Sequence, residues 1–175
     1  MRGVMESKRL IYRPMTDEDF NAACSFLQDP EVMYAWEHAF SGEEVRGWIS
    51  ENMRRFKEGG VGYLLAFERR TGEVVGNIGL LQETVNGETH LGVGYILRRR
   101  FWGMGYAAEG AKACLDYAFK FLMADRVIAT IRPENQRSIL SLIHILPWRL
   151  LPGTAGRFPE QTELGRSWRR GLRWN

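Results

Sequence analysis

Cysteine is scarce in this chain of 175 residues, which holds only Cys24 and Cys114. Both fall in segments of helical pattern, and neither belongs to a Cys-x-x-Cys pair or to a Cys/His spacing typical of zinc. We therefore expect two buried free thiols, no disulfide framework and no metal site.

Long hydrophobic runs are also missing. No apolar stretch approaches the roughly 20 residues that span a bilayer, and the opening MRGVMESKRLIYR lacks the uninterrupted apolar core of a signal peptide. These absences predict a cytoplasmic protein with no membrane partner. With 45% hydrophobic and 26% charged residues, the chain has the composition of a globular domain.

An excess of charge of one sign is absent from most of the chain. The formal net charge is +3, but residues 1–138 hold 18 basic and 19 acidic residues, whereas residues 139–175 hold 6 arginines and 2 acidic residues. The basic character is therefore a property of the C-terminal segment, and nucleic acid is not an expected partner.

What the chain does have is a regular alternation of helical and strand patterns. Helices are expected over 16–27, 41–60 and 106–123 and from 132 onward, with Thr16 and Ser41 as N-caps. Strands are expected over 9–15, 61–68, 73–82, 89–97 and 126–131, the last of them compact and buried. Short turns join the three central strands into an antiparallel meander, and a helix crosses over to the next strand. The sequence thus predicts an α/β domain with a mixed sheet.

The segment RRRFWGMGYAAEG, residues 98–110, joins the third meander strand to a helix. Its glycines allow close backbone approach, and the first N–H groups of a helix are unpaired, so the turn fits a phosphate or pyrophosphate. A dinucleotide fingerprint is formally present at 103–108, but three meander strands precede it and Asp125 stands before a strand rather than at the end of one. A Walker A loop is excluded because Ala111 stands where its lysine is needed. The glycines alone leave both an anion site and a plain turn open.

A longer stretch, GVGYILRRRFWGMGYAAEGAKACLDYAF, resembles the GCN5-related N-acetyltransferase (GNAT) superfamily. It is most similar to the branch that acetylates the N-terminal alanine or serine of ribosomal proteins, and small amines. Arg100, Gly103 and Gly105 match the Arg/Gln-x-x-Gly-x-Gly/Ala acyl-CoA loop, and FWGMGYAAE matches the aromatic-Trp-Gly-x-Gly-Tyr-Ala-x-Glu string of the branch. RLIYRPMTDED, VVGNIGL and IRPENQRSI resemble its opening strand, its Gly-x-Ile-Gly strand and its Pro-x-Asn-x-x-Ser segment. The resemblance covers residues 8–139 and implies an acyl-CoA N-acyltransferase fold.

The resemblance also implies an activity. Acetyl-CoA would be the co-substrate, and a primary amine, either a protein N-terminus or a small amine, would attack it directly in a ternary complex. The strand before the loop would pair with the pantetheine arm, the loop N–H groups would hold the pyrophosphate, and an N–H near Ile96 would polarise the thioester carbonyl. The implied coenzyme-binding residues are Tyr95, Ile96, Leu97, Arg100, Phe101, Trp102, Gly103, Met104, Gly105, Tyr106, Ala107, Asn135 and Ser138. A homodimer is a further expectation.

The acid and base of the reaction are less clearly marked. A primary amine is mostly protonated near neutral pH, so transfer needs a base or a water chain. The candidates are Glu83, Glu88 and His90, on or beside the central strands, and Ser138. Many relatives carry a tyrosine seven positions after the asparagine as an acid, and this chain has Leu142 there. An impaired acyl-CoA-binding or interaction module is therefore the alternative function.

Residues 140–175 depart from the family pattern. The family continues with an amphipathic helix and two strands, whereas Pro147, Pro152 and Pro159 interrupt any long helix here and no alternating strand pattern appears. We therefore expect an acetyl-CoA-binding core over 8–139 and an atypical tail with Arg, Trp and Pro over 140–175. The hypothesis that we favour is a reading frame altered near codon 139, and a basic tail that contacts an anionic partner is the alternative.

Overall fold

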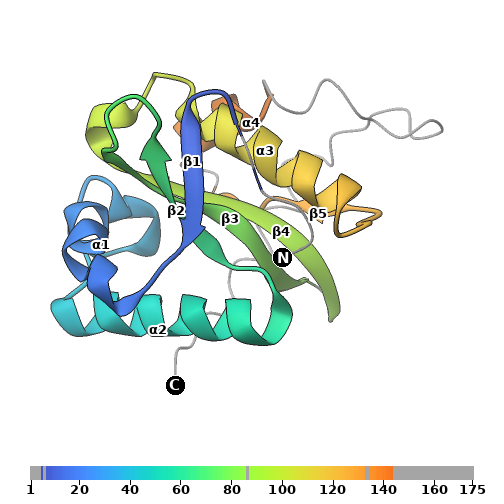
Figure 1. Ribbon diagram of the computed structural model, residues 1–175, viewed down its shortest axis with the longest axis horizontal. Coiled ribbons are helices and arrows are strands. Elements are labelled where there is room, and N and C mark those ends of the chain that lie inside the picture. Colours follow the sequence, from blue (N-terminus) through green and yellow to red (C-terminus); the bar gives the residue numbers. More distant parts are fainter. Residues whose placement is uncertain (1–4, 6, 86, 133–134, 144–175) are drawn as a thin grey trace.

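The structure is a computed structural model that describes residues 5, 7–85, 87–132 and 135–143. Its main elements, drawn in Figure 1, are β1 (Leu10–Pro14), α1 (Phe20–Leu27), α2 (Gly42–Gly59), β2 (Tyr63–Glu68), β3 (Val74–Val85), β4 (Glu88–Leu97), α3 (Tyr106–Lys120), β5 (Val127–Ile128) and α4 (Gln136–Ile143). Three short 3-10 turns accompany them, η1 (Asp17–Asp19), η2 (Met33–Trp36) and η3 (Arg99–Phe101). The predicted tail lies outside the described residues from position 144 onward, and the domain boundary at 139 stays a prediction.

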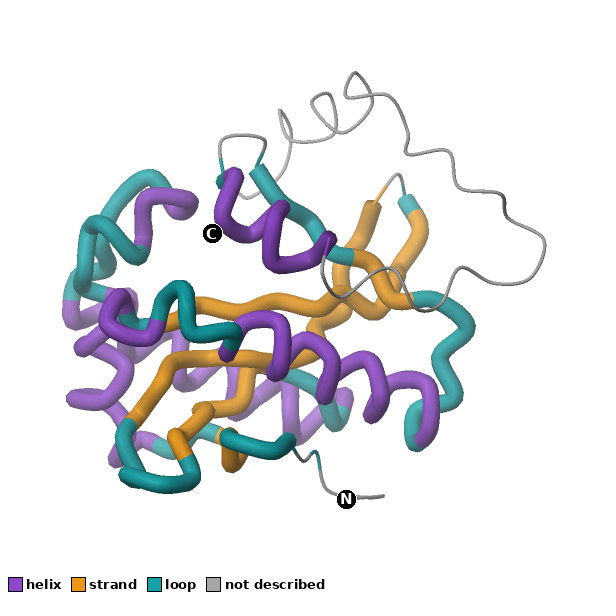
Figure 2. The backbone as a smooth tube through the Cα atoms, turned by 90° about the horizontal axis from the view of Figure 1, so that it is seen from above, coloured by secondary structure: helices purple, strands orange, loops and turns teal. Residues whose placement is uncertain are grey.

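The strands form a mixed sheet in the order β1-β2-β3-β4-β5. The first four pair antiparallel, and β5 pairs parallel to β4. Parallel pairing requires a crossover, which α3 supplies. The predicted α/β class, the meander and the helical crossover are therefore confirmed, and Figure 2 shows the strands as a twisted band with α3 and α4 lying along it.

Each face of the sheet carries its own hydrophobic core, because successive side chains of a strand point to opposite faces. The core against α3 includes Leu10, Ile78, Leu80, Val93, Leu97, Tyr106, Ala111 and Cys114. The core against α1 and α2 includes Phe26, Leu27, Ile49, Tyr63, Leu65, Leu81 and Ile96. The two faces of β4 therefore look into different environments, one beneath α3 and one beneath α2.

The capping predicted for α2 is confirmed. The Ser41 hydroxyl accepts a hydrogen bond from the Glu44 N–H, and the Glu44 carboxylate accepts one from the Ser41 N–H. That bond from the backbone of Ser41, together with His38, lowers the pKa of Glu44 to about 2. Gly60, with a φ of 70°, ends the helix in a left-handed conformation.

Three of the predicted elements differ in the structure. The strand predicted over 126–131 contains only Val127 and Ile128, which are half-buried because, among the described residues, they pair on one side alone. The helix predicted to reach Met123 ends at Lys120, since Met123 takes a φ of 53° and the chain turns away. The helix predicted from Thr16 begins only at Phe20, after the turn η1.

Both cysteines are free, as predicted, but only one of them is buried. Cys114 lies under the sheet, and burial raises its pKa to about 12. Cys24 is half-buried because Ala23, Phe26 and Leu27 form the inward face of α1 and Cys24 lies at its margin. The Cys114 thiol is therefore a packing group rather than a nucleophile.

Candidate functional site

The strands β4 and β5 diverge soon after they meet. Their ladder consists of Leu91 with Val127 and Gly92 with Ile128. From Val93 to Leu97, β4 continues to pair with β3, but no described strand lies on its other side. The divergence leaves one edge of the predicted pantetheine segment open.

The open edge of β4 leads into the Gly-rich loop and the start of α3. Gly103 and Gly105 have φ values of 72° and 78°, a left-handed conformation that favours glycine. The first hydrogen bond of α3 runs from the Glu109 N–H to the Gly105 carbonyl. Among the described residues, no acceptor binds the backbone N–H groups from Gly103 to Ala108. A row of free donors at a helix N-terminus fits a pyrophosphate.

The three arginines before the loop are engaged by the protein itself. Arg98 donates to the Val74 carbonyl, and Arg99 forms an ion pair with Glu31. Arg100 pairs with the Glu73 carboxylate through both terminal nitrogens, at 3.0 and 2.9 Å. The loop therefore offers its backbone, rather than free guanidinium groups, to an anion.

Arg9 and Glu109 hold this loop in place, a contact that the sequence analysis missed. The Glu109 carboxylate accepts from the Arg9 backbone N–H and from its Nε, both at 2.6 Å, and Arg9 Nη1 donates to the Met104 carbonyl at 2.9 Å. The Arg9 guanidinium also lies 4.3 Å from the centroid of the Tyr106 ring. One side chain thus connects β1, the loop and the first turn of α3.

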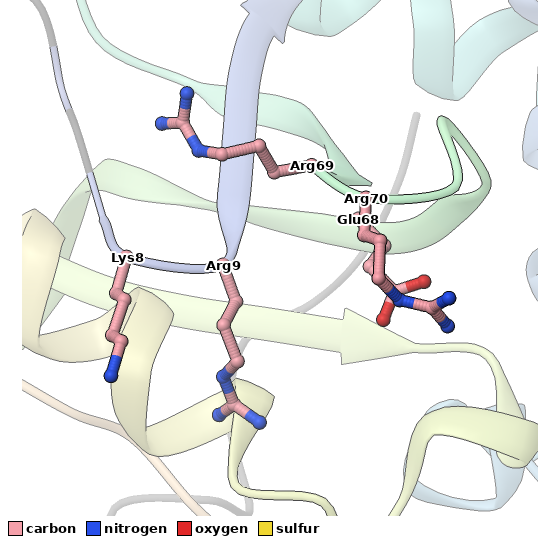
Figure 3. A pocket seen from close by; sticks show the side chains of 5 residues that line it. All are labelled: Lys8, Arg9, Glu68, Arg69 and Arg70. Atoms are coloured by element: carbon pink, nitrogen blue, oxygen red, sulfur yellow. The ribbon is translucent and has the colours of Figure 1, made fainter.

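Arg9 also borders a basic depression of about 290 Å³ beside the turn between β2 and β3. Its other lining residues are Lys8, Glu68, Arg69 and Arg70. Figure 3 shows Lys8 and Arg9 extending to one side and Arg69 to the other. Arg9 is held by Glu109 and Arg69 donates to the Ser7 carbonyl, so much of this charge is already engaged.

Replacing Glu109 by glutamine is expected to lower the free energy of unfolding at neutral pH by about 1–3 kcal/mol, because the bonds from Arg9 lose their ionic partner. Burial acts to raise the pKa of Glu109, but the backbone and side-chain bonds from Arg9 outweigh it, so the pKa is lowered. The stabilisation is therefore present above the ordinary glutamate pKa and is lost as the pH falls through the lower folded value. Urea denaturation at neutral and acidic pH measures this difference.

The matched control is Asp116→Asn on the same helix, which breaks an exposed ion pair with Lys112. Exposed pairs contribute only about 0.3–0.5 kcal/mol. An equal loss in both variants at neutral pH would contradict the role given to Glu109.

Three of the predicted coenzyme residues have side chains that are held by contacts within the protein. Phe101 and Tyr106 are 3% and 2% exposed, so their side chains belong to the core and only their backbones can meet a ligand. The Trp102 indole donates to the Leu97 carbonyl at 2.8 Å and lies beneath the Arg137 guanidinium of α4. Trp102 thereby occupies one of the β4 carbonyl groups that had been expected to face the pantetheine.

Two predicted residues lie at the start of α4. The Asn135 side-chain oxygen accepts from the Ser138 N–H at 3.0 Å, which makes Asn135 the N-cap of that helix. The Ser138 carbonyl accepts from the Tyr95 hydroxyl of β4 at 3.3 Å. The structure thus brings Tyr95, Asn135 and Ser138 together near the open edge of β4, and their contacts with a coenzyme stay predictions.

The candidate catalytic residues beside β4 lie in different environments. Glu83 and His90 face one another in the β3–β4 ladder. The Glu83 carboxylate crosses the face of β4 above Gly92 and accepts from the Thr130 hydroxyl at 2.5 Å. Glu88, by contrast, has a side chain that is 77% exposed, and its Oε2 lies 3.5 Å from His90 Nε2. Of these candidates, Glu83 is the one whose carboxylate lies over β4, at Gly92.

Among the residues that the structure describes, no group of three or more His, Cys, Asp or Glu side chains is arranged to hold a metal ion. Within the same residues, no helix has both the length and the apolar character needed to cross a membrane.

Comparisons with known proteins agree with this geometry. Residues 9–142 match the acetyltransferase (GNAT) domain family. The uncharacterised YkkB protein of Bacillus subtilis is 36% identical over 132 residues, which cover 75% of this chain and 77% of that protein. A solved GNAT-family acetyltransferase from Bacillus anthracis is 28% identical, with a TM-score of 0.69 over 80% of each chain.

The same fold occurs in RimL, a ribosomal L7/L12 alpha-N-protein acetyltransferase solved in complex with coenzyme A. That structure is 17% identical, with a TM-score of 0.69 over 82% of this chain and 83% of its own. Because the family match spans most of the chain and the diverging strands and Gly-rich loop accompany it, this chain belongs to the GNAT family of N-acetyltransferases.

Proposed function

We propose that the protein transfers the acetyl group of acetyl-CoA to a primary amine, either a protein N-terminus or a small amine, while both substrates are bound. One observation carries this proposal. The open edge of β4 over Val93–Leu97 leads directly into the free N–H groups of Gly103 to Ala108. An extended arm would pair with the open edge of β4, and a pyrophosphate at its end would bind the free N–H groups of the loop. Coenzyme A, which RimL holds in its solved structure, has that shape.

The residues of this chain fit such a ligand. The open edge of β4 offers backbone donors and acceptors to an extended arm, as an added strand would. The N–H groups of the loop bind the diphosphate, and the start of α3 adds its partial positive charge. When bound, acetyl-CoA supplies an activated thioester, and an N–H near Ile96 polarises its carbonyl.

Glu83 is the proposed base on the acceptor side. Its carboxylate lies on the α2 face of β4, and the hydrogen bond from Thr130 fixes its position. The acceptor ammonium gives a proton to Glu83, and the neutral nitrogen attacks the thioester carbonyl carbon. The C–N bond forms, the C–S bond breaks, and the thiolate leaves with the electron pair. The nitrogen releases its second proton to solvent and the thiolate takes one up, which gives a neutral amide and the free thiol of coenzyme A.

A thiol-release assay tests the function. The purified full chain is mixed with acetyl-CoA and with an Ala-initiated tetrapeptide, a Ser-initiated tetrapeptide or spermidine, and mass spectrometry follows the product. We expect acetyl-CoA binding, thiol release that depends on one of the amines, and an acetylated amine. Binding with no amine-dependent release would favour the impaired binding module. Absence of acetyl-CoA binding would contradict both functions.

A further inference from the structure

Tyr63 is a largely buried residue whose hydroxyl stays open to a ligand. The residue begins β2 and is 6% exposed. Its backbone N–H donates to Asn52 Oδ1 at 2.9 Å, and its ring stacks on Trp48 with the ring centroids 5.2 Å apart. No hydrogen bond joins its hydroxyl to another described residue, and the hydroxyl therefore reaches solvent, since no fully buried polar side-chain atom of the described residues lacks a partner. A hydroxyl that is open to solvent and free of internal partners can bind a ligand without breaking a hydrogen bond within the protein.

The hydroxyl of Tyr63 occupies the place where β4 lacks a side chain. A Cβ built on Gly94 would lie 2.3 Å from the Tyr63 hydroxyl oxygen. The Tyr63 ring therefore reaches from β2 past β3 to the α2 face of β4. Its position is fixed by the stacked Trp48, whose indole donates to Asn77 at 3.1 Å.

A second glycine of the same face gives room to Glu83. A Cβ built on Gly92 would lie 2.5 Å from Glu83 Oε1. Alternate residues of a strand are spaced by roughly 7 Å, so the Glu83 carboxylate and the Tyr63 hydroxyl flank a space of that order above β4. One nitrogen that makes hydrogen bonds of about 3 Å to both oxygens fits this space.

Resting on the function proposed above, we propose that the Tyr63 hydroxyl binds the acceptor amine, with its oxygen accepting a hydrogen bond from the amino group while Glu83 accepts the proton that the ammonium loses. Tyr63 keeps its own proton throughout. Burial is the main cause that raises the pKa of Tyr63, and the nearby Glu83 raises it further, so the phenol stays neutral.

Tyr63→Phe is the main test, because it removes the hydroxyl and keeps the ring. We expect the KM for the amine to rise by about 10- to 100-fold, as for the loss of a hydrogen bond to a charged group, with the KM for acetyl-CoA unchanged. The melting temperature is expected to stay close to that of the wild type, since no hydrogen bond to another described residue is lost. The matched control is Tyr117→Phe on α3, whose ring packs against Phe121 and which should leave both KM values unchanged.

Gly94→Ala tests the same contact from the other strand, since its methyl group would displace the hydroxyl. We expect the same selective rise in the KM for the amine. A Tyr63→Phe variant with an unchanged amine KM and a lowered melting temperature would overturn the proposal and make Tyr63 a packing residue.

Calorimetry separates this inference from the proposed function. Each amine of the panel is titrated into the chain loaded with coenzyme A, where no transfer can occur. Weaker amine binding by Tyr63→Phe supports the acceptor contact even if the wild type shows no turnover, in which case only the proposed function fails. Equal binding by both proteins, or no amine binding by the wild type, overturns the inference.

Discussion

Replacing Glu83 by glutamine should reduce amine-dependent turnover by about 10²- to 10⁴-fold, the range that a positioned general base contributes. Glutamine has the same shape and keeps an oxygen that can accept from Thr130, so the local structure is expected to persist. It cannot take the proton of the acceptor ammonium. The loss should therefore appear in kcat, with acetyl-CoA binding unchanged.

Steady-state thiol release at saturating acetyl-CoA measures this effect. Glu58→Gln is a suitable control, because it removes one carboxylate from the exposed face of α2, where Glu58 pairs with Arg54. A large loss of turnover in Glu88→Gln together with normal turnover in Glu83→Gln would show that the wrong carboxylate has been assigned.

Gly79→Ala should lower the free energy of unfolding by about 3–5 kcal/mol, a large share of the stability of a domain of this size. A Cβ at this position would lie 2.1 Å from the Gly62 carbonyl oxygen and 2.7 Å from the Tyr63 Cα. Both are backbone atoms beside the β2–β3 ladder, in which Tyr63 pairs with Gly79. The two strands cannot keep their spacing once a methyl group is added.

Urea denaturation followed by circular dichroism measures the loss. Gly47→Ala serves as the control, since no other atom lies within 4 Å of its added Cβ. Gly47 is inside α2, where alanine is expected to stabilise the helix by about 0.8–1 kcal/mol. Opposite shifts of the two midpoints are expected. An unchanged midpoint for Gly79→Ala would refute the close approach of the strands.

The glycine requirement extends over the whole Gly-x-Ile-Gly segment. A Cβ on Gly76, whose φ is 149°, would lie 2.1 Å from the Ile96 carbonyl oxygen. Ile78 in turn fills the space that Gly110 of α3 leaves open, 2.4 Å from a built Cβ. The segment that identified the family in the sequence is therefore a set of close backbone and side-chain approaches between β2, β3, β4 and α3.

Local patterns were enough to predict most of the fold. Ser41 as N-cap and the spacing of apolar residues predicted α2, because a helix is made of contacts three or four residues apart. The short turns predicted the meander because a tight turn also depends on residues that are close in sequence. The length of β5 could not be predicted, since a strand needs a partner and, within the part of the chain that the structure describes, Val127 and Ile128 pair with β4 alone.

The contacts of the site were harder to predict because they join distant parts of the chain. Arg9 and Glu109 are 100 residues apart, and Glu83 and Thr130 are 47 apart. The sequence did contain a weak signal for the proposed acceptor side, which is the α2 face of β4. Glycine is unfavourable inside a strand unless another group approaches closely, and Gly92 and Gly94 stand two residues apart in β4.

The Tyr63 hydroxyl occupies the space that a side chain at position 94 would need. This contact also limits which substitutions the two positions can accept during evolution. The strands β2 and β4 are not neighbours, because β3 lies between them, yet a homologue that gains a side chain at the position of Gly94 has room for it only if the residue at position 63 becomes smaller. Substitutions at the two positions should therefore covary. If Tyr63 binds the acceptor as proposed, the exchange of volume between the two positions would change the acceptor side and leave the coenzyme loop as it is.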